Sequence, residues 1–149
     1  MQNSSTALTN AFIDEIKRRL FTENIPRLKK CVSELTEAQI WYRPNNASNS
    51  VGNLVLHLHG NVRQWVVAGL GKSKDVRERQ KEFDEKGPIP LEKMLGDMDK
   101  LMEEVNQILN TTSTNDLLEV RNVQGYDESG LSILVHTVSY THLTLPTKA

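Results

Sequence analysis

The chain has four histidines among its 149 residues, and they lie in two short stretches. His57 and His59 are separated by one residue in the apolar run Leu54–Trp65, whereas His136 and His142 lie near the C-terminus. Histidine is a common metal ligand and can move a proton near neutral pH. Two such stretches in one small chain could therefore supply the two halves of a single site.

Two other sequence features that could carry chemistry have simpler interpretations. Gly69–Ser73 resembles the end of a phosphate-binding loop, but Val66 stands where that pattern needs glycine, and a predicted helix rather than a strand precedes it. Cys31 is the only cysteine, which excludes an intrachain disulfide and a cysteine-rich zinc site. We interpret Cys31 as a small buried residue of a helix, with a thiol activated by Lys29 and Lys30 as the alternative.

The composition limits the classes of function. Hydrophobic residues make up 38% and charged residues 25% of the chain, with a net charge of −1, which is typical of one globular domain spanning residues 1–149. The mixed charges offer no basic surface for nucleic acid. No apolar run approaches the length of a membrane span, and the N-terminus lacks a signal-peptide pattern. We therefore predict a cytoplasmic protein without nucleic-acid or membrane partners.

Hydrophobic periodicity predicts four amphipathic helices. They are expected at about residues 5–35, with a kink or break near Asn24 caused by Pro26, at about 51–70 after the cap Ser50, at about 91–109, and from Glu128 or Ser129 onward. The charged segment 72–90 has no apolar stripe and is interpreted as a long crossover or lid. Residues 116–126 are interpreted as a short extended piece. The predicted fold class is an all-α four-helix bundle.

The two histidines of the second predicted helix point in different directions. At about 100° per residue, His59 falls about 80° to one side of Val51 on the apolar stripe, and His57 about 120° to the other. Both imidazoles therefore cannot serve one site. His57 shares its side with Asn61 and Gln64, which form a polar strip at the edge of the stripe. A hydrogen-bonded boundary residue is the alternative interpretation of His57.

Several stretches carry a family resemblance. Asn49–Leu58 with Gly60–Trp65, the crossover phrase Glu82–Pro90, and Val123–Val138 resemble a DinB/YfiT-like subfamily over about residues 8–138. The resemblance implies a four-helix bundle in up-down-down-up order, often dimeric. It also implies a divalent metal held by one histidine of the second helix and by two histidines, four residues apart, on the fourth. Some relatives transfer low-molecular-weight thiols onto electrophiles, and many have no known activity.

The fourth helix departs from that pattern. His57 matches the second-helix ligand, and His59 occupies a position where the pattern asks for nothing particular. The family would place histidines at about 140 and 144, where this chain has Tyr140 and Thr144. His136 lies one turn earlier and is a weaker candidate. His142 is about 240° from His136 on a helix, on the side of an expected apolar stripe of Leu131, Leu134 and Val138.

The C-terminal residues 139–149 resemble a spurious ending found in predicted genes whose reads run into sequencing adapter. Leu143 and Leu145 alternate with polar residues like a strand, and Pro146 would stop a helix. We hypothesise that the native fourth helix is cut off near Val138 and is incomplete in this chain. Clean long reads across the genomic junction that retain the same ending would refute this hypothesis.

The predicted site therefore has His57 and His136 as metal ligands, and Asn61 and Gln64 as neighbouring or substrate-contacting residues. A catalytic zinc or nickel site needs three protein ligands, so we expect metal to bind weakly or not at all. Three interpretations remain open. The chain is a metal-dependent transferase that could use a low-molecular-weight thiol on a small molecule, a metal-free ligand-binding or interaction bundle, or a non-functional fragment with an exposed apolar groove.

Overall fold

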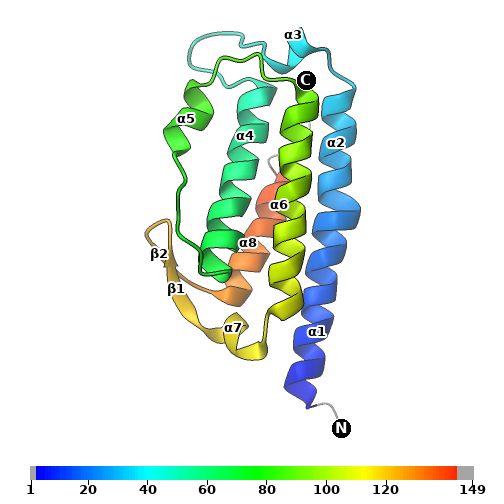
Figure 1. The fold of residues 1–149 in the computed structure, drawn as a ribbon, viewed down its shortest axis with the longest axis vertical. Coiled ribbons are helices and arrows are strands. Elements are labelled where there is room, and N and C mark those ends of the chain that lie inside the picture. The colour runs from blue at the N-terminus through cyan, green and yellow to red at the C-terminus, as the bar shows by residue number, and fades with distance from the viewer. Residues whose placement is uncertain (1–2, 144–149) are drawn as a thin grey trace.

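The computed structural model of the chain is mostly helical and describes residues 3–143 (Figure 1). Two of its helical segments, η1 and η2, are π-helical and continue α-helices. In chain order the elements are α1 (Ser4–Lys17), η1 (Arg18–Asn24), α2 (Ile25–Ser33), α3 (Glu37–Ile40), α4 (Val51–Val62), η2 (Arg63–Leu70), α5 (Arg79–Asp84), α6 (Leu91–Thr111), α7 (Thr114–Leu118), β1 (Val120–Val123), β2 (Tyr126–Ser129) and α8 (Gly130–Leu143).

The first helical stretch runs from α1 through η1 to α2 without leaving helical conformation. The expected irregularity near Asn24 takes the form of a change of helix type, because η1 ends at Asn24 and α2 begins at Ile25. Pro26 has no N–H to donate, so a regular α-helical hydrogen bond is missing at this place. The Ile25 N–H instead bonds to the carbonyl of Leu20. Cys31 in α2 is half-buried rather than fully buried.

The second long stretch, α4 and η2, begins and ends where the sequence predicts. Ser50 and Asn53 form a capping box, in which each side chain bonds to the other residue's backbone N–H. The stretch ends at Leu70, and Gly71 is its C-cap. The π-helical geometry of η2 changes which residues face the core, so that Val67 and Leu70 are buried along with Trp65 and Val66.

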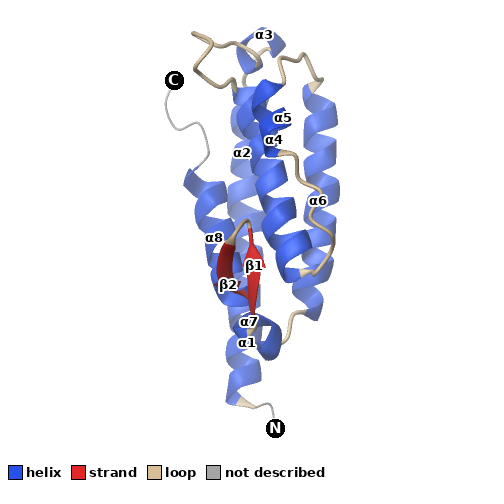
Figure 2. Cartoon of the chain, turned by 90° about the vertical axis from the view of Figure 1, so that its left-hand side faces the viewer, coloured by secondary structure: helices blue, strands red, loops and turns tan. Residues whose placement is uncertain are grey.

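The chain is mostly helical, as predicted, but between α6 and α8 it forms a two-stranded antiparallel sheet that was not predicted (Figure 2). Residues 116–126, expected as one extended piece, contain the end of α7, all of β1 and the turn into β2. Val120 pairs with Ser129 and Val123 with Tyr126. Gln124 and Gly125 both have positive φ, as a tight hairpin turn requires.

The long helices lie side by side with their axes roughly parallel, and the apolar core lies between them (Figures 1 and 2). The crossover between η2 and α6, which carries α5, runs along one side of α4. The hairpin lies beside α8, at the end of the molecule that carries α7. Within residues 3–143, no helix is both long and apolar enough to cross a membrane.

The last helix extends further than expected. We predicted that residues from Ser139 onward would continue the helix poorly, but α8 runs to Leu143. Thr141 is buried, accepts a hydrogen bond from Asn24 at 2.8 Å and donates one to the Val138 carbonyl at 3.0 Å. This packing outweighs the weak helix propensity of threonine. Residues 144–149, with Thr144 and Pro146, lie outside the described part of the chain.

The prediction that His142 lies on the apolar stripe of the last helix is also wrong. His142 is exposed, and so is Leu131 of the expected stripe. The face of α8 that packs into the core is rotated, and the buried residues on it are Gly130, Ile133, Leu134, Thr137 and Thr141. The predicted stripe used apolar residues alone and so left out the two buried threonines. For this reason the sequence pattern misplaced the buried face of α8.

Candidate functional site

A cavity of about 400 Å³ lies between α4, η2, the crossover, the hairpin and α8. Helices and crossover contribute His57, Asn61, Trp65, Arg77, Arg79, His136 and Tyr140, and the hairpin contributes Gln124, Tyr126 and Glu128. Residues 57, 61 and 65 follow each other at one-turn intervals along the second long stretch. The same interval separates residues 136 and 140 on α8. Two helices thus present facing rows of polar and aromatic side chains.

His57 lines this cavity and is only 6% exposed. Its Nδ1 lies 3.0 Å from Oε1 of Glu82 in α5, and its Nε2 is within hydrogen-bond distance of the Tyr140 hydroxyl. The Phe83 ring packs against the imidazole with 4.7 Å between ring centroids. The imidazole is therefore held between the crossover on one side and α8 on the other.

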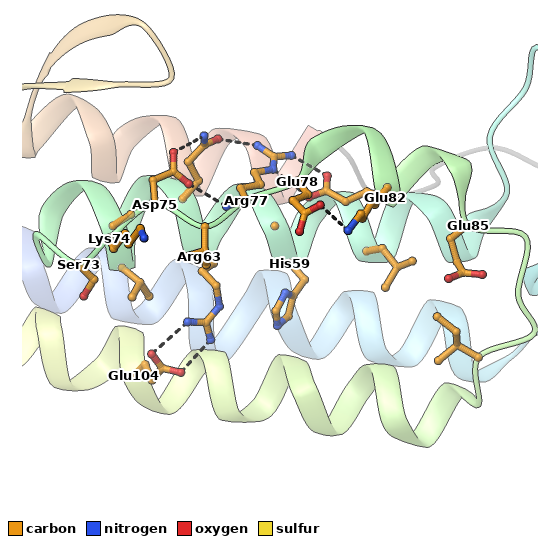
Figure 3. Close-up of a pocket in the computed structure, with 18 residues that line it drawn as sticks. His59, Arg63, Ser73, Lys74, Asp75, Arg77, Glu78, Glu82, Glu85 and Glu104 are labelled. Atoms are coloured by element: carbon orange, nitrogen blue, oxygen red, sulfur yellow. Dashed lines mark hydrogen bonds and ion pairs between the residues drawn. The ribbon is translucent and has the colours of Figure 1, made fainter.

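Arg77 connects His57 to the crossover through a short chain of polar groups. Its guanidinium donates to both carboxylate oxygens of Glu82, at 2.8 and 2.9 Å, and to Oε1 of Gln64 at 2.8 Å. Gln64 in turn donates to Asp75 at 2.8 Å (Figure 3). The side chains of Arg77 and Glu82 are only 4% and 12% exposed, so this ion pair is largely removed from water.

The crossover is fixed to the start of α4 by partly buried hydrogen bonds. Asn53 donates to the carbonyls of Glu82 and Glu85, at 2.9 and 2.7 Å. Arg43 donates to the carbonyls of Phe83 and Glu85, and to Oδ1 of Asn53. Because these bonds hold the backbone on both sides of Phe83, they place the Glu82 side chain against His57.

Trp41 and three glycines complete the packing of the crossover. A Cβ added at Gly52 or at Gly87 would lie 2.8 Å or 2.3 Å from the Trp41 ring, so the indole packs directly against both backbones. Its Nε1 donates to the carbonyl of Ile89. At Gly60 an added Cβ would lie 1.9 Å from Oε2 of Glu82. Glycine at these positions is what allows the crossover to approach α4 so closely.

The cavity keeps both of its histidines neutral near physiological pH. Burial lowers the pKa of His57, the hydrogen bond to Glu82 raises it, and the charge of Arg77 lowers it further. Burial also lowers the pKa of His136, against an opposing effect of the Glu128 carboxylate. A neutral imidazole carries one nitrogen with a free lone pair, which can accept a proton or bind a ligand.

His136 stacks on Trp65, with ring centroids 3.6 Å apart and an angle of 13° between the rings. The indole N–H of Trp65 donates to Gln124 of the hairpin. Nε2 of His136 and Oδ1 of Asn61 are both buried and have no hydrogen-bond partner among the described residues. Buried polar atoms usually have a partner, so these two atoms in one cavity point to a bound ligand or water.

The structure brings His57, His136 and Asn61 together in this cavity, while the other predicted positions lie elsewhere. Gln64 reaches the site only through Arg77. His59 lies in a separate cavity of about 470 Å³ between α4, the crossover and α6 (Figure 3). The two neighbouring histidines of α4 therefore diverge, as their spacing predicts.

Three residues of the site were not among the predicted ligands. Glu82 lies within the crossover phrase that carries the family resemblance, so a signal for it was present. Arg77 lies in a charged run that offered nothing to distinguish it from its exposed neighbours. Tyr140 was noted only as a departure from the family's histidine, yet it contacts His57 directly. Contacts across the bundle are long-range, and no local pattern encodes them.

The described residues do not complete a three-ligand metal centre. His57 and His136 line the same cavity, but residues 3–143 contain no group of three or more histidine, cysteine, aspartate or glutamate side chains that could hold a metal ion. Nε2 of His57 faces a phenol, and its Nδ1 faces Glu82 and Arg77. A catalytic zinc site usually has three protein ligands and one open position.

Comparison with known proteins identifies the family of the chain. A search of curated proteins finds no match to the chain. The sequence model of a family described as mycothiol-S-transferase matches residues 18–142, which begin at η1 and include α2, the second long stretch, the crossover, α6, the hairpin and all of α8 except its last residue. The matched region contains every residue that lines the His57 cavity. The chain therefore belongs to the mycothiol-S-transferase family, a DinB/YfiT-like family.

Proposed function

We propose that the chain is a thiol-dependent transferase whose reaction takes place in the His57 cavity. The family's name supplies the thiol, mycothiol, a low-molecular-weight thiol that would be joined to a small electrophile. The observation that carries this proposal is the buried His57 itself. It belongs to the family's second-helix motif, faces a cavity large enough for part of a small molecule, and is oriented by a carboxylate on its far side.

The chemistry follows the general arrangement of a nucleophile, a base and a group that orients the base. The thiol sulfur would approach Nε2 of His57 in place of the Tyr140 hydroxyl, and its S–H would donate to that nitrogen. His57 then takes the proton as the sulfur attacks carbon of the electrophile. A carbon–sulfur bond forms, the bond to the leaving group breaks, and the proton passes from His57 to the leaving group.

Asn61 and His136 would contact the substrate on either side of the sulfur. Their unpartnered atoms, Oδ1 and Nε2, are buried in the cavity wall and would gain hydrogen bonds from polar groups of the thiol or the electrophile. Gln64 would act only indirectly, by holding Arg77. These roles are proposals for the same residues that the sequence pattern singled out.

No step of this proposal passes through a metal, because the described residues do not complete a metal centre. We propose further that the chain is one domain, a four-helix bundle in up-down-down-up order, which the side-by-side helices support. A homodimer and a cytoplasmic location stay predictions.

The proposal is tested by following thioether formation with purified protein. Mycothiol, or N-acetylcysteine as a simpler thiol, is mixed with 1-chloro-2,4-dinitrobenzene, and the absorbance of the product is recorded. We expect a rate above that of the uncatalysed reaction, and a loss of about 10²-fold or more in His57→Gln. The matched control is His59→Gln, two residues away on the same helix, which should keep the wild-type rate.

Metal dependence is measured in the same samples. Elemental analysis and prior treatment with a chelator show whether activity follows bound metal. Equal rates in wild-type protein and His57→Gln, or no rate above background with any thiol tested, would refute the proposed function. Activity that rises in proportion to bound zinc or nickel would refute the metal-free reaction.

A further inference from the structure

We infer that Glu82 and Arg77, two residues of the crossover, determine which ring nitrogen of His57 carries the proton. Neutral imidazole exists as two tautomers, and only the one protonated at Nδ1 leaves a lone pair on Nε2. Nε2 is the nitrogen directed towards Tyr140 and the cavity. Glu82 is thus assigned as a positioning residue acting through His57.

The contacts at Nδ1 decide between the tautomers. Oε1 of Glu82 lies 3.0 Å from Nδ1, and Nη2 of Arg77 lies 3.1 Å from it. A carboxylate can only accept, so it requires a proton on Nδ1, whereas the guanidinium can only donate and would require a lone pair there. The two neighbours therefore favour opposite tautomers, and the stronger interaction determines the state.

Arg77 itself resolves this competition in favour of Glu82. Its guanidinium donates to both oxygens of the Glu82 carboxylate, and also to Gln64 and to the His57 carbonyl. A guanidinium that donates to both carboxylate oxygens fixes the carboxylate in place, and the carboxylate is a strong acceptor. Arg77 has these other acceptors and does not need Nδ1. Nδ1–H therefore donates to Glu82, and Nε2 accepts from the Tyr140 hydroxyl.

Gly60 makes this arrangement sterically possible and provides a way to disturb it without removing a functional group. An added Cβ at this position would lie 1.9 Å from Oε2 and 2.8 Å from Cδ of Glu82, and 3.0 Å from Nε of Arg77. The carboxylate would have to move away from its present position. Gly60→Ala should thus displace Glu82 while leaving Glu82, Arg77 and His57 in the sequence.

The tautomer is read directly by long-range ¹H–¹⁵N NMR of the histidine rings, recorded at pH 8, with the His57 signals assigned from His57→Gln. We expect Nδ1–H in the wild type. In Glu82→Ala and Gly60→Ala the proton should move to Nε2. The Nδ1 resonance should then have the chemical shift of a nitrogen with a lone pair, and the Nε2 resonance that of a protonated nitrogen. Glu82→Gln should retain Nδ1–H, because its amide oxygen can still accept. The matched controls, Glu103→Ala and Gly96→Ala in α6, should match the wild type.

The part of Glu82 in catalysis rests on the proposed function, whereas the tautomer is measured without any transfer activity. If the chain is a transferase, Glu82→Ala should lower kcat by about 10²-fold with a smaller effect on KM, and Glu82→Gln should recover part of it. A wild-type His57 protonated at Nε2 would overturn the inference. So would a tautomer that stays the same in both Glu82→Ala and Gly60→Ala.

Discussion

Replacing Asn53 with alanine should be among the most damaging single changes to this fold. The Asn53 side chain is fully buried and makes five hydrogen bonds. It donates to the carbonyls of Glu82 and Glu85 and accepts from Arg43, from the Ser50 backbone N–H and from the Ser50 hydroxyl. The variant removes all five bonds, at both the start of α4 and the crossover.

The expected cost can be estimated from the groups that lose a partner. Each lost hydrogen bond is worth about 1 kcal/mol, and each buried group left unpaired costs roughly 1–3 kcal/mol. The Glu85 carbonyl keeps its bond from Arg43, so the Glu82 carbonyl and the Ser50 N–H are the main groups left without a partner. The free energy of unfolding should fall by about 3–5 kcal/mol, a large part of the 5–15 kcal/mol typical of a domain.

Urea unfolding followed by circular dichroism measures this change, with Asn49→Ala, an exposed position just before α4, as the control. Asn53→Asp is the near-isosteric companion, because it removes only the two donated bonds and places a carboxylate oxygen against two carbonyls. It should also destabilise the fold. A loss below about 1 kcal/mol in Asn53→Ala, with an unchanged urea dependence, would refute the proposed anchoring of the crossover by this side chain.

Four further changes have expected outcomes that can be measured by unfolding. Gly52→Ala should destabilise the chain by about 1–3 kcal/mol in urea unfolding, because the added Cβ would lie 2.8 Å from the Trp41 ring. Gly96→Ala should stabilise the chain by up to about 1 kcal/mol, because no heavy atom lies within 4 Å of the added Cβ and alanine favours a helix more than glycine does. Thr141→Val removes one of the two acceptors of the Asn24 amide, which keeps the Val138 carbonyl, and should cost about 1–3 kcal/mol. An unchanged unfolding midpoint would argue against the packing of the last turns of α8. Hydrogen bonds of the α7 capping box lower the pKa of Asp116. The ionised carboxylate therefore stabilises the fold above the unfolded pKa of 3.8, and this contribution is lost as the pH falls through the lower pKa of the folded state. Between pH 5 and pH 2 the urea midpoint should fall less in Asp116→Asn than in the wild type.

Local sequence signals predicted the helices well, because caps and apolar periodicity act over a few residues. Ser50 as the cap of α4 and the end of the second long stretch near Gly71 are confirmed. The π-helical turns of η1 and η2 could not be read from a fixed rotation of about 100° per residue. The sequence predicted an extended piece at residues 116–126 but not the hairpin turn. The turn depends on the positive φ of Gln124 and Gly125, which a hydrophobic pattern does not indicate.

Residues of the candidate cavity were predicted on α4, which carries the strongest motif, and less firmly on α8. His57 and Asn61 followed from one-turn spacing, and the structure places both in one cavity with His136. Glu82 and Arg77 come from the charged segment 72–90, which was interpreted as a long crossover or lid. Their burial depends on glycines and polar anchors elsewhere in the chain, which act across the fold. Sequence periodicity carries no information about such pairs.

The two tryptophans of the chain lie in separate environments, and this makes the protein its own optical reporter. Trp41 packs between the start of α4 and the crossover, whereas Trp65 stacks on His136 in the cavity. Replacing either one with phenylalanine leaves a single fluorophore. Emission from Trp41 would then follow the docking of the crossover, and emission from Trp65 would follow the filling of the cavity. Binding and crossover movement can thus be timed separately in one stopped-flow experiment without an added dye.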